Sequence, residues 1–279
     1  MIITDLVYEQ IRNDLGLYAP ERGGALYGPK GYPVSSHFEY DDEGATTSVS
    51  YVPSSRLIAN VVQIETGTGL QFKGIVHSHP AGYSHPSEGD RTTAGSFFKL
   101  NPHFAVMAMP IVQRIAPGPS AHEQPFLHWF RAELRAPPPQ ALGFLYRSSS
   151  GPVVDIIEEE FYVLPLWTHM EKLIAELRTH GFMLGCEKKV QHLRIANAQL
   201  LGLVASDSYG HELMYFVPFD YPVVSPIVFY QRRNVTANLK LHWDGLKDPD
   251  ESLKRLVEEL LGEWSSATPK PGASPENAV

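Results

Sequence analysis

The chain has 279 residues, of which 43% are hydrophobic, and a formal net charge of -8. Its length accommodates one large domain or two of ordinary size, and its apolar content is that of a globular protein with a core. The acidic balance argues against nucleic acid and anionic membranes as partners, because both require a basic surface. The single cysteine, Cys186, excludes an internal disulfide and a multi-cysteine zinc site. Since the chain has no apolar run of about 20 residues and does not begin like a signal peptide, we expect a cytoplasmic protein.

The first 163 residues alternate between helical and strand-like patterns. Apolar residues recur at helical spacing between Thr4 and Leu15, and Ser54 or Ser55 is suited to cap a second helix. Ser87 is suited to begin a third helix that runs to about residue 99. The segments with strand-like patterns are 21–28, 72–79, 104–109, 126–134 and 153–163. This succession predicts an α/β sandwich, with a first domain at residues 1–163.

A second, smaller α+β domain is predicted for residues 164–264. Its first helix has an apolar face from Leu166 to Leu177. Strand-like pieces follow at 190–195, 200–205 and 213–217. Asp248 is suited to cap a last helix, because a proline and a glutamate stand in the first turn. Residues 265–279 are rich in Ser, Pro and Ala, and we expect them to form a disordered tail.

The stretch that carries most chemical information ends at Asp90. Residues i and i+2 of a strand point to one face, so His77 and His79 can present both imidazoles to one ion. Asp90 follows after a loop that contains glycine and proline, and would supply a third ligand. Two histidines and one aspartate leave a tetrahedral zinc ion with an open fourth position for water, which is typical of catalytic sites.

Each part of this constellation also has a structural explanation. With 12 histidines in the chain, a His-x-His pair arises by chance about half the time. The Ser87-x-x-Asp90 pattern is by itself a capping-box-like helix start. The two interpretations are compatible, because a cap would fix the helix terminus that delivers Asp90.

The pattern His77-x-His79-x7-Ser87-x2-Asp90 resembles the full metal-binding signature of the JAMM (MPN-plus) zinc metalloproteases, which include deubiquitinases. That family also carries an upstream glutamate before a small glycine-rich strand, and Glu21 stands in such a context. The resemblance covers roughly residues 1–160. It implies a sandwich similar to that of cytidine deaminases, with Zn2+ held by the two histidines and the aspartate.

The resemblance also implies roles for two further residues. Glu21 would accept a proton from water and deliver it to the leaving amine, while Ser87 would donate a hydrogen bond to the oxyanion. Zinc would lower the pKa of its water toward ~7. Without the family context, Glu21 would be interpreted as an exposed loop or first-turn residue. Its rivals for the same role are Glu9, Glu39, Glu43 and Glu65.

The second domain contains a proline-rich turn that begins at Tyr221-Pro222 and ends at Pro226. This Tyr-Pro-x-x-x-Pro pattern and the order of elements around it resemble the RWD and ubiquitin-conjugating-enzyme superfamily over residues 164–264. A generic α+β domain with such a turn is the alternative. A conjugating enzyme forms its thioester through a cysteine after this turn, and residues 227–243 contain none. We therefore expect a non-catalytic binding domain.

The leading hypothesis is a zinc isopeptidase that cleaves the amide bond at the C-terminal tail of a ubiquitin-like protein, by deconjugation or by precursor processing. The enzymes that conjugate this modifier are further candidate partners. The alternative from a different class is a non-catalytic scaffold that binds ubiquitin-like modifiers or their conjugation machinery. A zinc hydrolase for a small molecule or a sulfur-carrier protein would share the same ligands. A zinc nucleotide deaminase is disfavoured, because that chemistry uses cysteine ligands that this chain does not have.

Overall fold

The structure is a computed structural model. It describes residues 1–17, 19–115, 125–135, 154–180, 189–195, 198–206, 211–218, 221, 224–232, 235–239, 251, 254–255, 257–259 and 262. The chain divides into two compact units, Met1–Leu164 and Pro165–Val279. Among the described residues, no helix is both long and apolar enough to cross a membrane.

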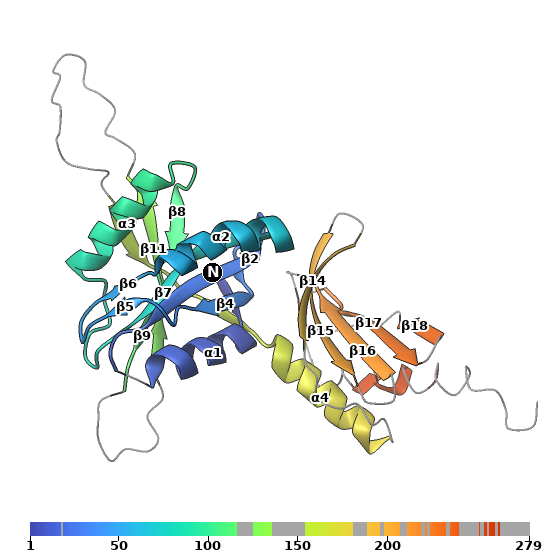
Figure 1. The fold of residues 1–279 in the computed structure, drawn as a ribbon. Coiled ribbons are helices and arrows are strands. Elements are labelled where there is room, and N and C mark those ends of the chain that lie inside the picture. The colour runs from blue at the N-terminus through green and yellow to red at the C-terminus, as the bar shows by residue number, and fades with distance from the viewer. Residues whose placement is uncertain are drawn as a thin grey trace, which may run out of the picture. The chain divides into compact units, whose positions relative to one another are not determined.

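An eight-stranded mixed sheet forms the centre of the first unit (Figure 1). Its long central strand is β7 (Leu70–His79), and β2 (Gly23–Pro29) runs antiparallel along one edge of that strand. On the other edge, two short strands pair in parallel with successive parts of β7, first β8 and then β9. These two strands are β8 (Val106–Ala108) and β9 (Ile111–Gln113). The remaining strands of the sheet are β4 (His37–Tyr40), β10 (Phe126–His128), β11 (Phe130–Leu134) and β12 (Val154–Glu158).

Helices cover both faces of this sheet, and each face has its own apolar core. α1 (Asp5–Gly16) packs on one face, while α2 (Ser55–Thr68) and α3 (Glu88–Leu100) pack on the other. Alternation along β2 separates the two cores: Tyr27 belongs to the core under α2 and α3, and Leu26 to the core under α1. The predicted α/β sandwich is therefore confirmed for this unit.

Both predicted serine caps are present, and of the two candidates for α2 it is Ser54 that forms the cap, while Ser55 is the first residue of the helix. The Ser54 hydroxyl accepts a hydrogen bond from the Leu57 N–H (3.0 Å) at the start of α2, and also donates to Asp41 (2.6 Å). Ser87 caps α3 in the same way. A free side-chain oxygen at this position satisfies an N–H group that the first turn of a helix leaves without a partner.

Three strand predictions in this unit need correction. The predicted strand 126–134 is interrupted at Trp129: β10 pairs with β9, whereas β11 pairs with β8 and β12. Residues 153–163 do not form one strand: β12 ends the main sheet, and β13 (Tyr162–Leu164) joins a separate parallel sheet with β1 (Ile2–Thr4) and β3 (Val34–Ser35). The predicted strand 104–109 is shorter, and a further strand, β9, begins after Pro110. The three errors have one cause: a strand ends where its pairing partner ends, and that partner lies far away in the chain. A short hairpin, β5 (Ala45–Thr46) and β6 (Tyr51–Val52), completes the unit.

The second unit begins with α4 (Leu166–Thr179), as its apolar face predicts. A five-stranded antiparallel sheet follows in chain order. Its strands are β14 (Lys189–Ile195), β15 (Ala198–Ser206), β16 (His211–Val217), β17 (Ile227–Arg232) and β18 (Val235–Leu239). The sequence did not predict β18. Tyr221 lies in the turn between β16 and β17 and is buried, and its hydroxyl meets the His169 ring of α4 and accepts from Tyr215 (3.3 Å).

Several predictions for this unit fall on residues outside the described ones. These are the residues Cys186, Pro222 and Asp248 and the tail 265–279. The described positions from 251 to 262 are helical, and Val257 among them is buried. Likeness to conjugating enzymes therefore remains a prediction.

Candidate metal centre

His77 and His79 stand at the carboxyl end of β7 and point to the same face. Their Nε2 atoms lie 2.9 Å apart, and each residue is only 5% exposed. Paired strands on both sides hold this end of β7: β2 faces His77 on one edge and β9 faces both histidines on the other. The two rings therefore converge on one point as the alternation of side chains predicts.

α3 delivers the third candidate ligand, Asp90, through its capping box. The Ser87 N–H donates to Asp90 Oδ2 (2.6 Å), and the Asp90 N–H donates to Ser87 Oγ (3.2 Å). This arrangement places Asp90 Oδ1 3.0 Å from His77 Nε2 and Oδ2 3.3 Å from His79 Nε2. The capping box therefore has two roles: its hydrogen bonds satisfy N–H groups at the start of α3, and they orient the Asp90 carboxylate toward the histidines.

The donor set fits a zinc ion. One ligand atom from each of His77, His79 and Asp90 lies within 4.8 Å of the others. Tetrahedral coordination with bonds of about 2.05 Å places ligand atoms about 3.3 Å apart, close to the observed separations. Two imidazole nitrogens and one carboxylate oxygen are zinc ligands, and three protein ligands leave a position open for water or substrate.

The charge of Asp90 suits this role. Burial opposes its ionisation, but hydrogen bonds from His77 and His79, the His77 charge and the Ser87 N–H outweigh burial. The pKa of Asp90 therefore lies well below its ordinary range. An ionised carboxylate is the form that binds a metal.

Glu21 lies just before β2 and is 3% exposed. Its N–H donates to the Thr47 carbonyl in the loop between β5 and β6 (3.0 Å). Burial raises the pKa of Glu21 from 4.5 to about 7; the charge of Asp90 also raises it, whereas the charges of His79 and Arg114 lower it. The ionisation of Glu21 is therefore coupled to the charges of two candidate ligands, His79 and Asp90.

The four other glutamates that the sequence offered for this role are engaged elsewhere. Glu39 accepts from Tyr27 (2.8 Å) and Asn60 (2.7 Å), and Glu65 accepts from the Phe72 N–H (2.8 Å). The remaining two form surface ion pairs: Glu9 with Arg12 and Glu43 with Arg56. Glu21 is the candidate whose charge is linked to that of Asp90.

Arg114, at the end of β9, is a residue of the site that sequence reasoning missed. Its N–H and Nε both donate to the His79 carbonyl (3.0 and 3.2 Å), and Nη2 donates to the Ser48 carbonyl (3.4 Å). It also lines a cavity of about 510 Å³ beside the metal strand, with Gly16, Leu17, Ala19, Pro80, Ala81 and Ile115. No local pattern could reveal this arginine, because each of its partners comes from a distant segment.

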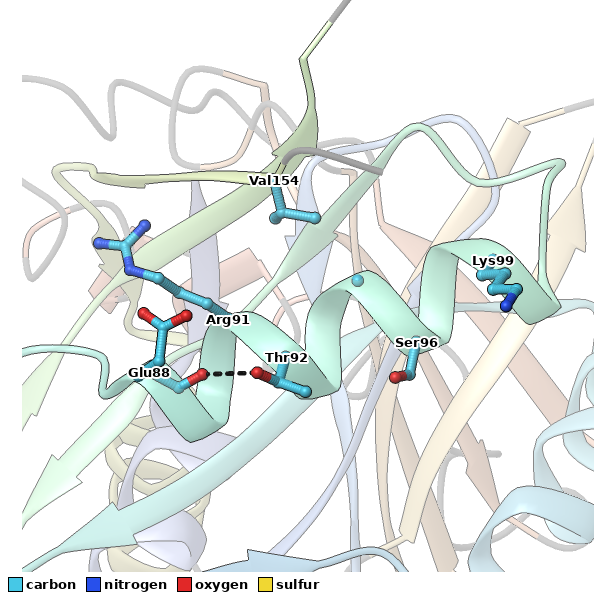
Figure 2. Close-up of a pocket in the computed structure, with 7 residues that line it drawn as sticks. Glu88, Arg91, Thr92, Ser96, Lys99 and Val154 are labelled. Carbon is cyan, nitrogen blue, oxygen red and sulfur yellow. Dashed lines mark hydrogen bonds between the residues drawn. The ribbon is translucent and has the colours of Figure 1, made fainter. Parts of the chain in front are cut away.

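A second cavity, of about 450 Å³, runs along one side of α3 (Figure 2). Its labelled residues on α3 follow helical spacing from Glu88 through Arg91 and Thr92 to Lys99, and Val154, the first residue of β12, also lines it. Its charges are mixed, and Thr92 bonds within the helix to the Glu88 carbonyl (3.0 Å). None of the three candidate ligands lines this cavity.

Residues 4–116 match the family model Prok-JAB, prokaryotic homologs of the JAB domain. A Desulfitobacterium hafniense protein with a solution structure is 18% identical; the similarity covers 59% of this chain and 94% of that one, with a TM-score of 0.39. A crystallised JAB1/MPN domain protein from Archaeoglobus fulgidus is 21% identical, with 40% and 78% covered and a TM-score of 0.23. The curated proteins gave no match. The candidate ligands, Glu21 and Ser87 all lie inside the segment that matches this family model, and the JAB/MPN family includes zinc hydrolases.

Proposed function

We propose that this chain is a zinc metallo-isopeptidase that hydrolyses the amide bond at the C-terminus of a ubiquitin-like protein. The observation that carries the proposal is the cluster of His77, His79 and Asp90, together with the buried Glu21, whose pKa burial raises to about 7 and whose ionisation responds to the charges of His79 and Asp90. A non-catalytic scaffold would not require a glutamate whose pKa is raised toward neutral pH. Perturbed carboxyl groups beside a cluster of metal ligands are typical of catalytic sites. The Prok-JAB match over the same residues supports this proposal.

The three ligand residues would hold the zinc ion, and Glu21 would move the proton. When bound, zinc supplies Lewis acidity, which polarises a carbonyl group and makes water acidic enough to ionise near neutral pH. Glu21 accepts a proton from water and later gives it to the leaving amine. A carboxyl group with a pKa of about 7 exchanges a proton in both directions near neutral pH, as this cycle requires.

Ser87 stabilises the carbonyl oxygen as it becomes negative. The serine oxygen accepts the Asp90 N–H in the capping box, and the hydroxyl proton takes no part in that bond. Ser87 is exposed at the N-terminus of α3, where the helix dipole favours negative charge. Capping and oxyanion binding therefore use different atoms of one hydroxyl group.

The substrate class follows from the resemblance to JAMM enzymes and from the second unit. A ubiquitin-like tail is an extended peptide, a form that suits cleavage in a narrow groove. We propose that the unit Pro165–Val279 binds the modifier or its conjugation enzymes, on the support of the Tyr221-Pro222 pattern and the absence of a cysteine after it.

The test is cleavage of a ubiquitin-like protein carrying a C-terminal fusion or conjugate, with zinc content measured for each variant. We expect wild type to cleave, and Glu21→Gln to retain zinc and lose cleavage by about 100- to 10,000-fold, the range typical of general acid–base catalysis. Glu43→Gln is the matched control, because Glu43 is exposed and pairs with Arg56. Zinc bound by a wild-type protein that cleaves no modifier would refute the proposed substrate. A protein that binds no zinc would refute the enzyme and favour a scaffold.

A further inference from the structure

Ser78 lies between the two candidate ligands in the chain but points away from their face of β7. It is 0% exposed. Its N–H donates to the Arg22 carbonyl (2.8 Å), and its hydroxyl accepts from the Arg22 N–H (3.0 Å). Ser78 is therefore bound twice to the residue that follows Glu21.

This contact stands where the ladder between β2 and β7 ends. The last pair in register is Gly23 with His77. One step further, Arg22 and Ser78 would exchange two backbone bonds in a regular antiparallel pair. One of the two bonds goes to the Ser78 hydroxyl instead of a carbonyl oxygen, so a side chain takes the place of the backbone at this step.

The position of Glu21 depends on this step. Three hydrogen bonds hold the segment just before β2. The Glu21 N–H donates to the Thr47 carbonyl and attaches the segment to the hairpin loop between β5 and β6. The other two attach it to β7: the Ser78 N–H donates to the Arg22 carbonyl, and the Arg22 N–H donates to the Ser78 hydroxyl. The bond to the hydroxyl is the one that depends on the Ser78 side chain.

We propose that Ser78 is a positioning residue, whose hydroxyl sets the place of the Glu21 carboxylate relative to the metal ligands through the Arg22 N–H. The inference concerns geometry, and its consequence for hydrolysis rests on the proposed function. Displacement of a catalytic group by about 1 Å can lower a rate on the order of 100-fold. Ser78→Ala should therefore lower kcat by about 10- to 100-fold without changing KM or zinc content.

Two further variants of Ser78 distinguish loss of its hydroxyl group from a general disturbance of packing. Ser78→Thr keeps the hydroxyl and should restore kcat to within about threefold of wild type; a Thr variant as slow as Ser78→Ala would overturn the proposal. Ser78→Cys keeps the shape with a weak acceptor, and carries the test if Ser78→Ala does not fold. Ser36→Ala is the matched control, since Ser36 is also buried and its hydroxyl has no partner among the described residues. It should leave kcat unchanged.

Two measurements test the role of Ser78 without an assay of enzyme activity. The first is hydrogen exchange in the metal-free protein. Ser78→Ala should speed exchange of the Arg22 amide by at least about tenfold, because the amide loses its acceptor. The Gly24 amide, whose residue pairs with Val76 inside the ladder, should exchange at the wild-type rate. Equal exchange of the Arg22 amide in variant and wild type would show that the bond does not hold this segment, and would overturn the proposal.

The second is a double-mutant cycle on the zinc dissociation constant, with Glu21→Gln and Ser78→Ala. If Ser78 places the Glu21 carboxylate beside the ligands, the effect of Glu21→Gln on zinc binding should change on the order of fivefold in the Ser78→Ala background. Additive effects would overturn the proposal. Because zinc binding is measured alone, the cycle still decides the role of Ser78 if no modifier is cleaved. Failure of the proposed function and failure of this inference are thus distinguishable.

Discussion

Removing the charge of Glu21 should stabilise the metal-free protein, and only above mildly acidic pH. Burial raises the pKa of Glu21 from its ordinary 4.5 to about 7 in the folded protein. Below pH 4.5 the carboxyl group is protonated in both the folded and the unfolded state, so Glu21→Gln should have little effect. As pH rises from 4.5 to 7, the unfolded state loses this proton first, and the folded wild type loses stability relative to the glutamine variant.

The magnitude follows from the difference between the two pKa values. A tenfold change in proton affinity corresponds to 1.36 kcal/mol, so a pKa of about 7 against 4.5 corresponds to about 3 kcal/mol. Above pH 7 the difference should stay constant. For a unit of this size, about 3 kcal/mol raises Tm by roughly 10 °C.

The assay is urea or thermal unfolding of wild type and Glu21→Gln between pH 4 and pH 8, with a chelator present. Added zinc is the internal control, because a bound cation favours the ionised carboxylate and should reduce the advantage of the variant. A variant that is no more stable at pH 8 than wild type would refute the buried, perturbed state of Glu21. A difference that does not change with pH would assign the effect to packing instead.

Four further predictions concern zinc binding and the stability of the unit that carries the site. Asp90→Asn should leave zinc bound substoichiometrically after dialysis, as measured by metal analysis, because the set loses its only anionic ligand. Gly74→Ala should destabilise the protein by about 1–3 kcal/mol or prevent folding, since the new Cβ would lie 1.9 Å from the Ala108 carbonyl oxygen on β8. Gly67→Ala, in α2 with open space around it, should instead stabilise by about 1 kcal/mol in the same urea titration. Ser54→Ala should lower the free energy of unfolding by about 1 kcal/mol through loss of the α2 cap, and unchanged stability would contradict the cap.

The sequence predicts those parts of the site that depend on local rules. Alternation along a strand places His77 and His79 on one face, and the Ser87 cap starts the helix that carries Asp90. The same rules could not place Arg114, because its partners are backbone carbonyls at Ser48 and His79, which no side-chain pattern encodes.

The errors in the fold have a related physical origin. Strand length was predicted from apolar runs, yet a strand ends where its partner ends. β8 and β9 therefore appear as two short strands around Pro110, each beside a different part of β7. Glu21 was selected by the resemblance of its context to the JAMM family, but only the buried position shows that its pKa is raised.

Different restraints hold the ligands and Glu21, and this difference separates metal binding from hydrolysis. Paired strands on both sides fix the histidines, and a capping box fixes Asp90. Glu21 stands outside the ladder and is held by Thr47 and, through its neighbour, by Ser78. Changes in the loop between β5 and β6 should therefore leave zinc bound and reduce hydrolysis, whereas changes at the start of α3 should reduce both. A scaffold that uses zinc only for stability would show no such separation, because its partner binding would follow zinc content in every variant.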